Sequence, residues 1–359
     1  RTLRLPHLRR GLLGALATLS AIALAPSTAM AEGCAAPDGG LGVSRIVEID
    51  PKAGPLYGHL SRYEREPSFL GPKEVVLTFD DGPAPGLTTS ILETLDRFCT
   101  KATFFVVGQM ALATPEGIGN ILKRGHTIGT HTWSHPMNMP RLSLDKARNQ
   151  IESGFAAAAI VAKGQVAPFF RFPGLADSPA LLAYLQDRGI ATFTVDVVSN
   201  DSYIADPARL IQLTFDRLEP QGRGILLFHD IKSVTARALP AILARLKERG
   251  YKVVHLRAPR NYAPLPDYVE SVRRAAESGR NAKRLLPFFA AAGVGDGTDA
   301  PAPASPADAA EAPAPATAAA SLGPVPVTTL VPEPKARFAR PLPKGVAAAP
   351  AQPPPVSAA

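Results

Sequence analysis

The feature that most constrains the fold of this chain is a regular alternation of β-prone runs and helical stretches between about residues 74 and 256. Such alternation indicates parallel strands joined by helical crossovers. The predicted strands are residues 75–79, 102–107, 126–129, 169–172, 190–197, 225–228 and 252–254, and the predicted helices are residues 88–98, 115–124, 143–162, 178–188, 207–218 and 235–249. Seven strands favour an α/β fold in the form of a compact, incomplete barrel over the eight units of a complete one.

A doubly wound open sheet is the structural alternative. Such a sheet usually carries a Gly-rich phosphate loop after its first strand. Here the first strand is followed by Asp80-Asp81-Gly82-Pro83, which is no such loop. The barrel is therefore favoured, and its carboxyl-terminal strand ends are where reactive groups are expected.

The first 31 residues have the pattern of a secretory signal. Four arginines precede an apolar stretch over residues 11–25, and Ala29-Met30-Ala31 offers the small-x-small pattern that signal peptidase reads. No later segment reaches the ~20 apolar residues that a membrane span needs. We expect residues 1–31 to be a signal peptide and the protein to be exported, periplasmic or secreted, with no membrane span after cleavage. An uncleaved N-terminal anchor is the alternative.

Charge and cysteine content exclude several classes of protein. The formal charge of +8 falls to 8 − 4 = +4 when the four arginines of the signal are removed. That excess is too small and too scattered to indicate a nucleic-acid partner. The two cysteines, Cys34 and Cys99, are too few for a disulfide-dense scaffold. Whether these two pair after export stays open, because the sequence gives no distance between them.

The segments that flank the barrel differ from it in composition. Residues 32–72 are rich in Gly and Pro and predict an irregular N-terminal extension, residues 73–265 form the barrel domain, and residues 266–292 a C-terminal helical segment. Residues 293–359 hold 15 of the 37 prolines and are dominated by Ala and Pro. A segment of that composition cannot bury enough apolar surface to offset its chain entropy, so we expect a disordered tail.

Two adjacent carboxylates follow the first predicted strand. Successive side chains of a strand point to opposite faces, so Asp80 and Asp81 can share one site only where the strand ends. Gly82-Pro83 supplies that ending. An Asx-type turn is the alternative explanation of the pair.

Two histidines four residues apart follow the third predicted strand. His131 and His135 would lie on one face of a helical turn, a spacing that suits a metal ion. With one carboxylate from a neighbouring strand end they form a plausible three-ligand site with an open position, as catalytic zinc requires. His126 opens the same strand, so we expect it at the far end of the barrel in a structural role.

Two further polar groups follow later strands. Arg171 comes after the fourth predicted strand and could hold a carboxylate in its ionised form. His229 follows the sixth and could donate a proton near neutral pH. Each group alone has an ordinary structural explanation, but four polar motifs at equivalent strand ends of one barrel indicate a catalytic site.

Together these motifs resemble the polysaccharide deacetylases of carbohydrate esterase family 4, whose catalytic part is called the NodB homology domain. The resemblance rests on Thr-Phe-Asp-Asp-Gly-Pro, His-Thr-x-x-His, Arg-x-Pro, Asn-Asp and Leu-x-His-Asp in this order, and covers about residues 75–256. It implies a distorted (β/α)7 barrel and metal-dependent removal of N-acetyl groups from an amino-sugar polymer. By position, it implies that Asp80 is the general base, that Arg171 orients it, and that His229 is the general acid. It also implies one divalent metal ion, usually zinc, held by Asp81, His131 and His135.

On the substrate side the resemblance is incomplete. It implies that Leu227 lines the pocket for the acetyl methyl group, and that Pro173 and Gly174 face the substrate, with a backbone N–H near Gly174 at the oxyanion. The third motif of the family usually ends in Tyr, where this chain has Gly174, and the fourth usually reads Asp-x-x-Asp-Trp, where this chain has Val198 and Ser202 at the first and last positions. The loss of two aromatic side chains suggests a more open sugar site.

The missing aspartate leaves His229 without one expected carboxylate partner. Asp196 lies two residues before Val198 and would share its face if the strand continued that far, so it is our first candidate. Asp201 and Asp230 are the alternatives.

These observations favour an exported, metal-dependent hydrolase that removes N-acetyl groups from chitin, peptidoglycan or another acetylated amino-sugar polysaccharide. Two alternatives remain open. One is an amidase of the same fold that acts on a small amide, and the other is a non-catalytic glycan-binding protein of the cell wall. The second alternative has no need of a base and an acid together.

Overall fold

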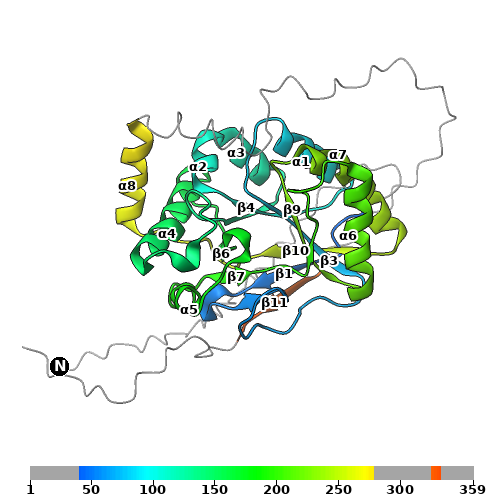
Figure 1. Cartoon of the computed structure of the whole chain (residues 1–359), viewed down its shortest axis with the longest axis horizontal. Coiled ribbons are helices and arrows are strands. Elements are labelled where there is room, and N and C mark those ends of the chain that lie inside the picture. Colours follow the sequence, from blue (N-terminus) through cyan, green and yellow to red (C-terminus); the bar gives the residue numbers. More distant parts are fainter. Residues whose placement is uncertain (1–39, 279–324, 333–359) are drawn as a thin grey trace, which may run out of the picture.

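The computed structural model describes residues 40–278 and 325–332. Its centre is a barrel of parallel strands surrounded by helices (Figure 1). The strands that follow the predicted alternation are β3 (Glu74–Asp80), β4 (Thr103–Val106), β5 (Thr127–Thr130), β6 (Phe169–Phe170), β7 (Ala191–Phe193), β8 (Val197–Val198), β9 (Gly224–His229) and β10 (Lys252–Arg257). The α/β barrel predicted from the alternation is confirmed.

The ring of the barrel is interrupted at one strand. Pairing runs from β3 through β4, β5 and β6 to β7, and returns from β8 through β9 to β3. The predicted strand 190–197 is thus two short strands, because its first part, β7, pairs with Leu56–Tyr57 of the N-terminal extension and not with β9. The Thr194 N–H donates to Tyr57 O at 2.8 Å within that pairing. Two residues later the Asp196 N–H donates to Ile225 O at 2.9 Å and resumes pairing with β9.

Helices cover the outer face of the barrel. The α-helices are α1 (Leu87–Arg97), α2 (Gly108–Ala113), α3 (Pro115–Lys123), α4 (Leu144–Val161), α5 (Pro179–Asp187), α6 (Pro207–Gln221), α7 (Ser233–Glu248) and α8 (Pro266–Glu277), and the 3₁₀ turns are η1 (Pro51–Ala53), η2 (Met139–Arg141) and η3 (Pro173–Leu175). Their starts follow ordinary capping rules: Ser143 caps α4 and Asp206 caps α6 through side-chain oxygens. The last helix, α8, lies against α4 (Figure 1).

Alternate residues of each strand face two different apolar clusters. An outer cluster joins Leu77, Phe79, Leu226 and Phe228 to the buried faces of the helices. The inner cluster contains no buried residue of an α-helix and is formed by strand and loop residues; its members from the ring strands are Val76, Phe105, Phe169, Ala191, Phe193, Ile225 and Leu227. Burying each of its phenylalanines contributes about 1.5–3 kcal/mol. This alternation determines which strand residues point into the barrel.

The N-terminal extension is more regular than the sequence predicted. It contributes β1 (Arg45–Ile49), which pairs with β10, and β2 (Leu56–Tyr57), which pairs with β7. The physical reason is burial, since β1 places Val47 and Ile49, both fully buried, in the inner cluster. The Gly and Pro content of residues 32–72 gave no indication of these short strands in the sequence.

The tail also differs from the expectation in one place. Val327–Leu330 forms β11, which pairs in parallel with β1 (Figure 1). This run is β-prone and free of Pro and Ala, and β1 offers it an edge. Residues 1–39, 279–324 and 333–359 lie outside the described residues, and so do the predicted signal peptide and Cys34 of the possible Cys34–Cys99 pair. Within the described part of the chain, no helix has the length and apolar character required to cross a bilayer.

Candidate metal centre and active site

Three charged side chains meet at the carboxyl-terminal end of the barrel because they occupy inward-facing positions. Asp80 has the strand parity of Val76, and His229 that of Leu227, both of which lie in the inner cluster. Arg171 follows β6 with the parity of the inward Phe169. The alternation of the strands therefore directs all three side chains to one end of the barrel interior.

Arg171 holds Asp80 in place. It is fully buried, and its Nη1 donates to Asp80 Oδ1 at 2.7 Å and to Thr78 Oγ1 at 2.8 Å. Its remaining donors reach the carbonyls of Phe193 and Thr194 at the interruption between β7 and β8. Burial raises the pKa of Asp80 to about 6 although the Arg171 charge opposes the rise. The second oxygen, Asp80 Oδ2, lies on the side of His131, 3.8 Å from its Nε2.

Asp81 joins the same site through an unusual backbone conformation. Its φ of 81° lies in the left-handed region, which a non-glycine residue adopts at a cost of about 1 kcal/mol or more. This turn allows adjacent aspartates to share one site, as the sequence required. Asp81 Oδ1 is buried and has no hydrogen-bond partner among the described residues. A buried carboxylate oxygen without a partner is costly unless another ligand binds it.

His131 and His135 approach that oxygen from the loop after β5. Their Nε2 atoms lie 3.5 Å and 3.2 Å from Asp81 Oδ1. The predicted helical turn is wrong: Thr132 and His135 have φ values of 72° and 55°, and the loop is irregular. Hydrogen bonds fix the loop instead, since His135 N donates to Thr132 Oγ1 at 3.0 Å and Gly108 N donates to Thr132 O at 2.9 Å.

The three side chains fit a divalent metal ion. One ligand atom from each of Asp81, His131 and His135 lies within 4.8 Å of the others. His131 Nδ1 is 2.7 Å from Arg171 O, which assigns the proton to Nδ1 and leaves Nε2 free to ligate. Burial, helped by His135, lowers the pKa of His131 to about 3, so the ring is neutral as a metal ligand must be. Two imidazoles and one carboxylate suit zinc, and also iron, manganese or cobalt.

His229 is paired with Asp201. Asp201 Oδ1 lies 2.6 Å from His229 Nδ1, while Asp201 Oδ2 accepts the His229 N–H at 2.7 Å and the Thr235 hydroxyl at 2.6 Å. Burial lowers the pKa of His229, but the charges of Asp201 and Asp81 outweigh it and raise that pKa to about 10. The ring is therefore held protonated with Nε2 toward the site, 3.9 Å from Asp81 Oδ2.

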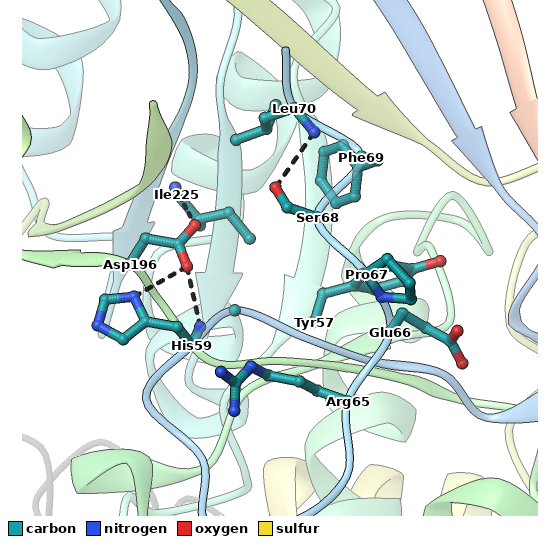
Figure 2. A pocket seen from close by; sticks show the side chains of 11 residues that line it. Tyr57, His59, Arg65, Glu66, Pro67, Ser68, Phe69, Leu70, Asp196 and Ile225 are labelled. Carbon is teal, nitrogen blue, oxygen red and sulfur yellow. Dashed lines mark hydrogen bonds and ion pairs between the residues drawn. The ribbon is translucent and has the colours of Figure 1, made fainter. Parts of the chain in front are cut away.

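Asp196 does not support His229, which corrects our first candidate. The strand is interrupted before it, and Asp196 pairs with Ile225 at the start of β9, four residues or about 13 Å from His229 at its end. Its Oδ1 accepts His59 N at 2.9 Å and lies 3.2 Å from His59 Nδ1, and its Oδ2 accepts Ile225 N at 2.8 Å (Figure 2). Asp196 thus lines a separate cavity of about 440 Å³ beside the extension.

Asp230, the other alternative, does not contact His229 through its carboxylate either. It is buried and accepts the Thr88 hydroxyl at 2.7 Å on Oδ2. Burial raises its pKa to about 7. Of the three candidate carboxylates, only Asp201 is placed against His229.

The predicted substrate-side residues differ in exposure. Leu227 is nearly buried in the inner cluster two residues before His229. Pro173 is buried at the start of η3, and Gly174 is exposed with a φ of 59°. A side chain at Gly174 would start 2.7 Å from Met137 Cε, so Met137 covers the place where the family usually has Tyr.

Two residues at the rim were missed by sequence reasoning. Met137 and Tyr203 are 61% and 89% exposed, and they follow His135 and Asp201, respectively, by two residues. In the described part of the chain, Tyr203 is the most exposed of the large apolar side chains. Their distance from the motifs is short in sequence, so a search for apolar side chains just beyond each motif would have found them.

The fold is a parallel α/β barrel, and its strand ends bring together a possible Asp/His/His metal site, an aspartate paired with a buried arginine, and a histidine paired with a buried aspartate. A family model described as polysaccharide deacetylase matches residues 70–193. The chain is 31% identical over 185 residues to a peptidoglycan-N-acetylglucosamine deacetylase of Bacillus cereus, a match that covers 51% of this chain and 85% of that protein. The chain therefore belongs to the polysaccharide deacetylase family, as the motifs implied.

Two further relatives agree. The chain is 35% identical over 190 residues to a peptidoglycan-N-acetylmuramic acid deacetylase of Bacillus subtilis, which covers 51% of this chain but only 38% of that protein. The structure resembles a peptidoglycan deacetylase of Bdellovibrio bacteriovorus with a TM-score of 0.55 and 32% identity over 62% of this chain and 63% of that one. The chain thus spans well under half of the Bacillus subtilis relative, and the likeness concerns the barrel.

Proposed function

We propose that this protein is an exported, metal-dependent deacetylase that hydrolyses N-acetyl groups of a peptidoglycan-type polysaccharide. The observation that carries the proposal is the convergence of Asp80, the Asp81–His131–His135 set and the Asp201–His229 pair at one end of the barrel. Family membership supports the reaction, and the names of the relatives support an amino-sugar polymer as substrate.

Each side chain has a position that suits one step. A divalent ion, with zinc as the expected one, would supply charge to polarise the acetamide carbonyl and to acidify a water molecule. Asp80 has one oxygen fixed by Arg171 and a second, Oδ2, that faces the ligand set and can take the proton of the attacking water.

His229 is placed to complete the reaction. Because Asp201 binds its Nδ1, the proton that points into the site is on Nε2. That proton is transferred to the departing amine, without which the amide C–N bond does not break near neutral pH. As the family motifs imply, we assign Leu227 and the Pro173–Gly174 turn to the walls of the space for the acetyl group.

The rim supports a polymeric substrate. Tyr203 and Met137 present apolar surface to solvent on loops that follow different strands of the ring, β8 and β5. A pyranose ring has apolar faces that bury against such side chains. We assign to these two side chains the contacts that the missing family aromatics would otherwise make.

The deciding experiment measures acetate release from peptidoglycan, acetylated chitin oligomers and poly-N-acetylglucosamine, with a small cyclic amide as a fourth substrate. The protein is stripped with a chelator and titrated with zinc, cobalt or manganese. Acetate release that returns with metal supports the proposal. Turnover of the small amide alone, or glycan binding without acetate, would support one of the two alternatives instead.

Export has its own test, because it rests on the sequence of residues 1–31. Expression of the full chain in a bacterial host, followed by fractionation and N-terminal sequencing, should give a periplasmic or secreted product that begins near Glu32. A product retained in the membrane with its N-terminal segment intact would show an anchor.

A further inference from the structure

A buried carboxylate that the proposed reaction does not use lies beneath the turn that carries Asp81. Asp230 is 1% exposed and directly follows His229 at the end of β9. Its side chain does not enter the site. It contacts Thr88, at the start of α1, whose hydroxyl donates to Asp230 Oδ2 at 2.7 Å.

Asp230 and Thr88 contact the turn that carries Asp81 at three points. The Asp230 carboxylate lies against the Gly82 backbone, and the Asp230 main-chain N–H donates to Asp80 O at 3.3 Å as part of the β3–β9 pairing. Thr88 Oγ1 accepts the Ala84 N–H at 2.8 Å. The backbone on both sides of Asp81 is therefore bound by these two residues.

The fit at Gly82 shows how close this contact is. A Cβ on Gly82 would lie 2.0 Å from Asp230 Oδ2 and 2.2 Å from Oδ1. A side chain is impossible there unless Asp230 moves, so the glycine is required by the approach of the carboxylate. Gly82 of the Asp-Asp-Gly-Pro motif is thus packed against Asp230, a residue outside the motif.

The turn needs such support because of Asp81. Its left-handed φ of 81° is unfavourable for a residue with a side chain, and it is that conformation that brings the Asp81 carboxylate to His131 and His135. An unfavourable conformation persists only where surrounding contacts determine it. The Asp81 N–H, which donates to Phe105 O at 3.2 Å, supplies one such contact, and Asp230 with Thr88 supplies the others.

We propose that Asp230 and Thr88 are positioning residues that hold the Asp80–Gly82 turn in its ligating conformation and so set the affinity of the Asp81–His131–His135 site for its metal ion. This inference rests on the proposed metal site. Neither residue belongs to the proposed ligand set, so their effect is transmitted through the packing of Asp230 against the Gly82 backbone and through the Ala84 amide.

A comparison within the molecule separates this role from ordinary structural burial. Glu152 is also a fully buried carboxylate, and it is bound by Arg188, Tyr184 and Tyr262 in a network between α4, α5 and the segment before α8. Asp230 has no such cation, and its Oδ1 has no hydrogen-bond partner among the described residues. A purely structural carboxylate would be satisfied as Glu152 is.

The test compares the metal affinity of four variants with that of the wild type. Thr88→Val removes the hydroxyl with little change of shape, and Thr88→Ser keeps the hydroxyl. Asp230→Asn keeps one carbonyl acceptor. Glu152→Gln disturbs the buried network away from the site. Metal dissociation constants come from competition with a chromophoric chelator, and unfolding midpoints from circular dichroism. Both readouts are independent of turnover.

Thr88→Val and Asp230→Asn should weaken metal binding about 10- to 100-fold, the range for outer partners of metal ligands. Thr88→Ser should stay near the wild type, and Glu152→Gln should lower the unfolding midpoint with unchanged metal affinity. If Asp230→Asn fails to fold, Thr88→Val alone decides. A Thr88→Val protein with a lower midpoint and wild-type metal affinity would overturn the inference.

These outcomes separate the inference from the proposed function. A wild-type protein that binds metal but releases no acetate from any glycan refutes the function, while the affinity series still tests the turn. A wild-type protein that releases acetate, together with variants at Thr88 and Asp230 whose metal affinity equals that of the wild type, refutes the inference alone. A wild-type protein that binds no divalent ion refutes both.

Discussion

The two ends of strand β5 carry histidines with opposite environments. At its amino-terminal end His126 is buried, its Nδ1 accepts the Ala102 N–H at 3.1 Å, and its neighbours include the buried His255. At its carboxyl-terminal end His131 and His135 face Asp81. The same residue type, on the same strand, is structural at one end and ligating in geometry at the other. A nearby carboxylate and the carboxyl-terminal end of a strand therefore identify the site, whereas a histidine alone does not.

The largest test of this comparison removes one histidine from each end. His135→Ala should abolish stoichiometric metal binding and lower acetate release by more than about 100-fold, beyond the effect of losing an outer partner. His126→Gln should lower the unfolding midpoint, because it disturbs a buried contact, and keep full metal content. Metal analysis of the folded fraction, beside the acetate assay, distinguishes them. Full metal content in His135→Ala would break the comparison.

The second test uses the two ends of β9. Asp201 binds His229 at the end of this strand, and Asp196 binds Ile225 at its start. Asp201→Asn should lower kcat by about 100-fold, within the usual range for acid–base catalysis, with metal content unchanged. Asp196→Asn should leave kcat within about twofold of the wild type. A larger loss of kcat in Asp196→Asn than in Asp201→Asn would restore the original candidate.

Asp196 also shows where sequence reasoning stops. The alternation of strands and helices and the strand-end motifs are local patterns, and they predicted the barrel and the end at which its polar side chains gather. The choice between Asp196 and Asp201 depended on an interruption of the strand, which arises because Tyr57 of a distant segment accepts the Thr194 N–H. No pattern within residues 190–201 contains that information.

The predictions of an irregular N-terminal extension and of a helical turn between His131 and His135 were wrong for similar reasons. β1 is stabilised by pairing with β10 and β11, both more than 200 residues away in the chain, so its own Gly- and Pro-rich surroundings were misleading. The loop from His131 to His135 has helical spacing, but Thr132 and His135 have left-handed φ values, and the Gly108 N–H donates to Thr132 O. The residue types and their spacing selected side chains whose ligand atoms the structure brings within 4.8 Å of one another, although the predicted conformation between the two histidines was wrong.

The third test concerns how the free energy of unfolding depends on pH through the histidines at the amino-terminal end of the barrel. Burial, with the charges of Arg257 and Lys101, lowers the pKa of His255 to about 3, and burial lowers that of His126 as well. The unfolded chain, with histidine pKa values near 6.5, takes up these protons first as the pH falls. The free energy of unfolding is therefore complete above about pH 6.5 and falls below it, by up to about 1.4 kcal/mol per pH unit for each histidine.

His255→Gln checks the origin of that slope. Glutamine can still donate to Thr127 Oγ1, which lies 3.0 Å from His255 Nε2 and itself donates to Leu256 O at 2.6 Å. Urea unfolding of this variant between pH 7 and 4 should show a shallower loss of stability than the wild type. The matched control is His59→Gln, since His59 is 43% exposed and pairs with Asp196 away from the barrel interior. Equal slopes in the wild type and His255→Gln would exclude His255 as a source.

The smallest expected effect is at the rim of the catalytic end, where exposure rather than charge distinguishes the two ends. Tyr203 is 89% exposed, two residues beyond Asp201, whose partner His229 also lies within 3.4 Å of Ser202 Oγ. A sugar ring that covers about 40 Å² of the Tyr203 face gains about 1 kcal/mol, or about fivefold in affinity. Tyr203→Ala should raise KM by about that factor for longer oligosaccharides and leave kcat unchanged, because the residue touches no reacting atom.

Two controls make this last effect specific. Tyr203→Phe keeps the ring and should retain the wild-type KM, and Val327→Ala removes an exposed apolar side chain, 54% exposed on β11, and should change nothing. The effect should also disappear with a substrate too short to reach the rim, since a single N-acetylated sugar occupies only the space at His229. An equal KM for Tyr203→Ala and the wild type on every chain length would show that the polymer leaves the site along another path, with Met137 on the opposite loop as the next residue to replace.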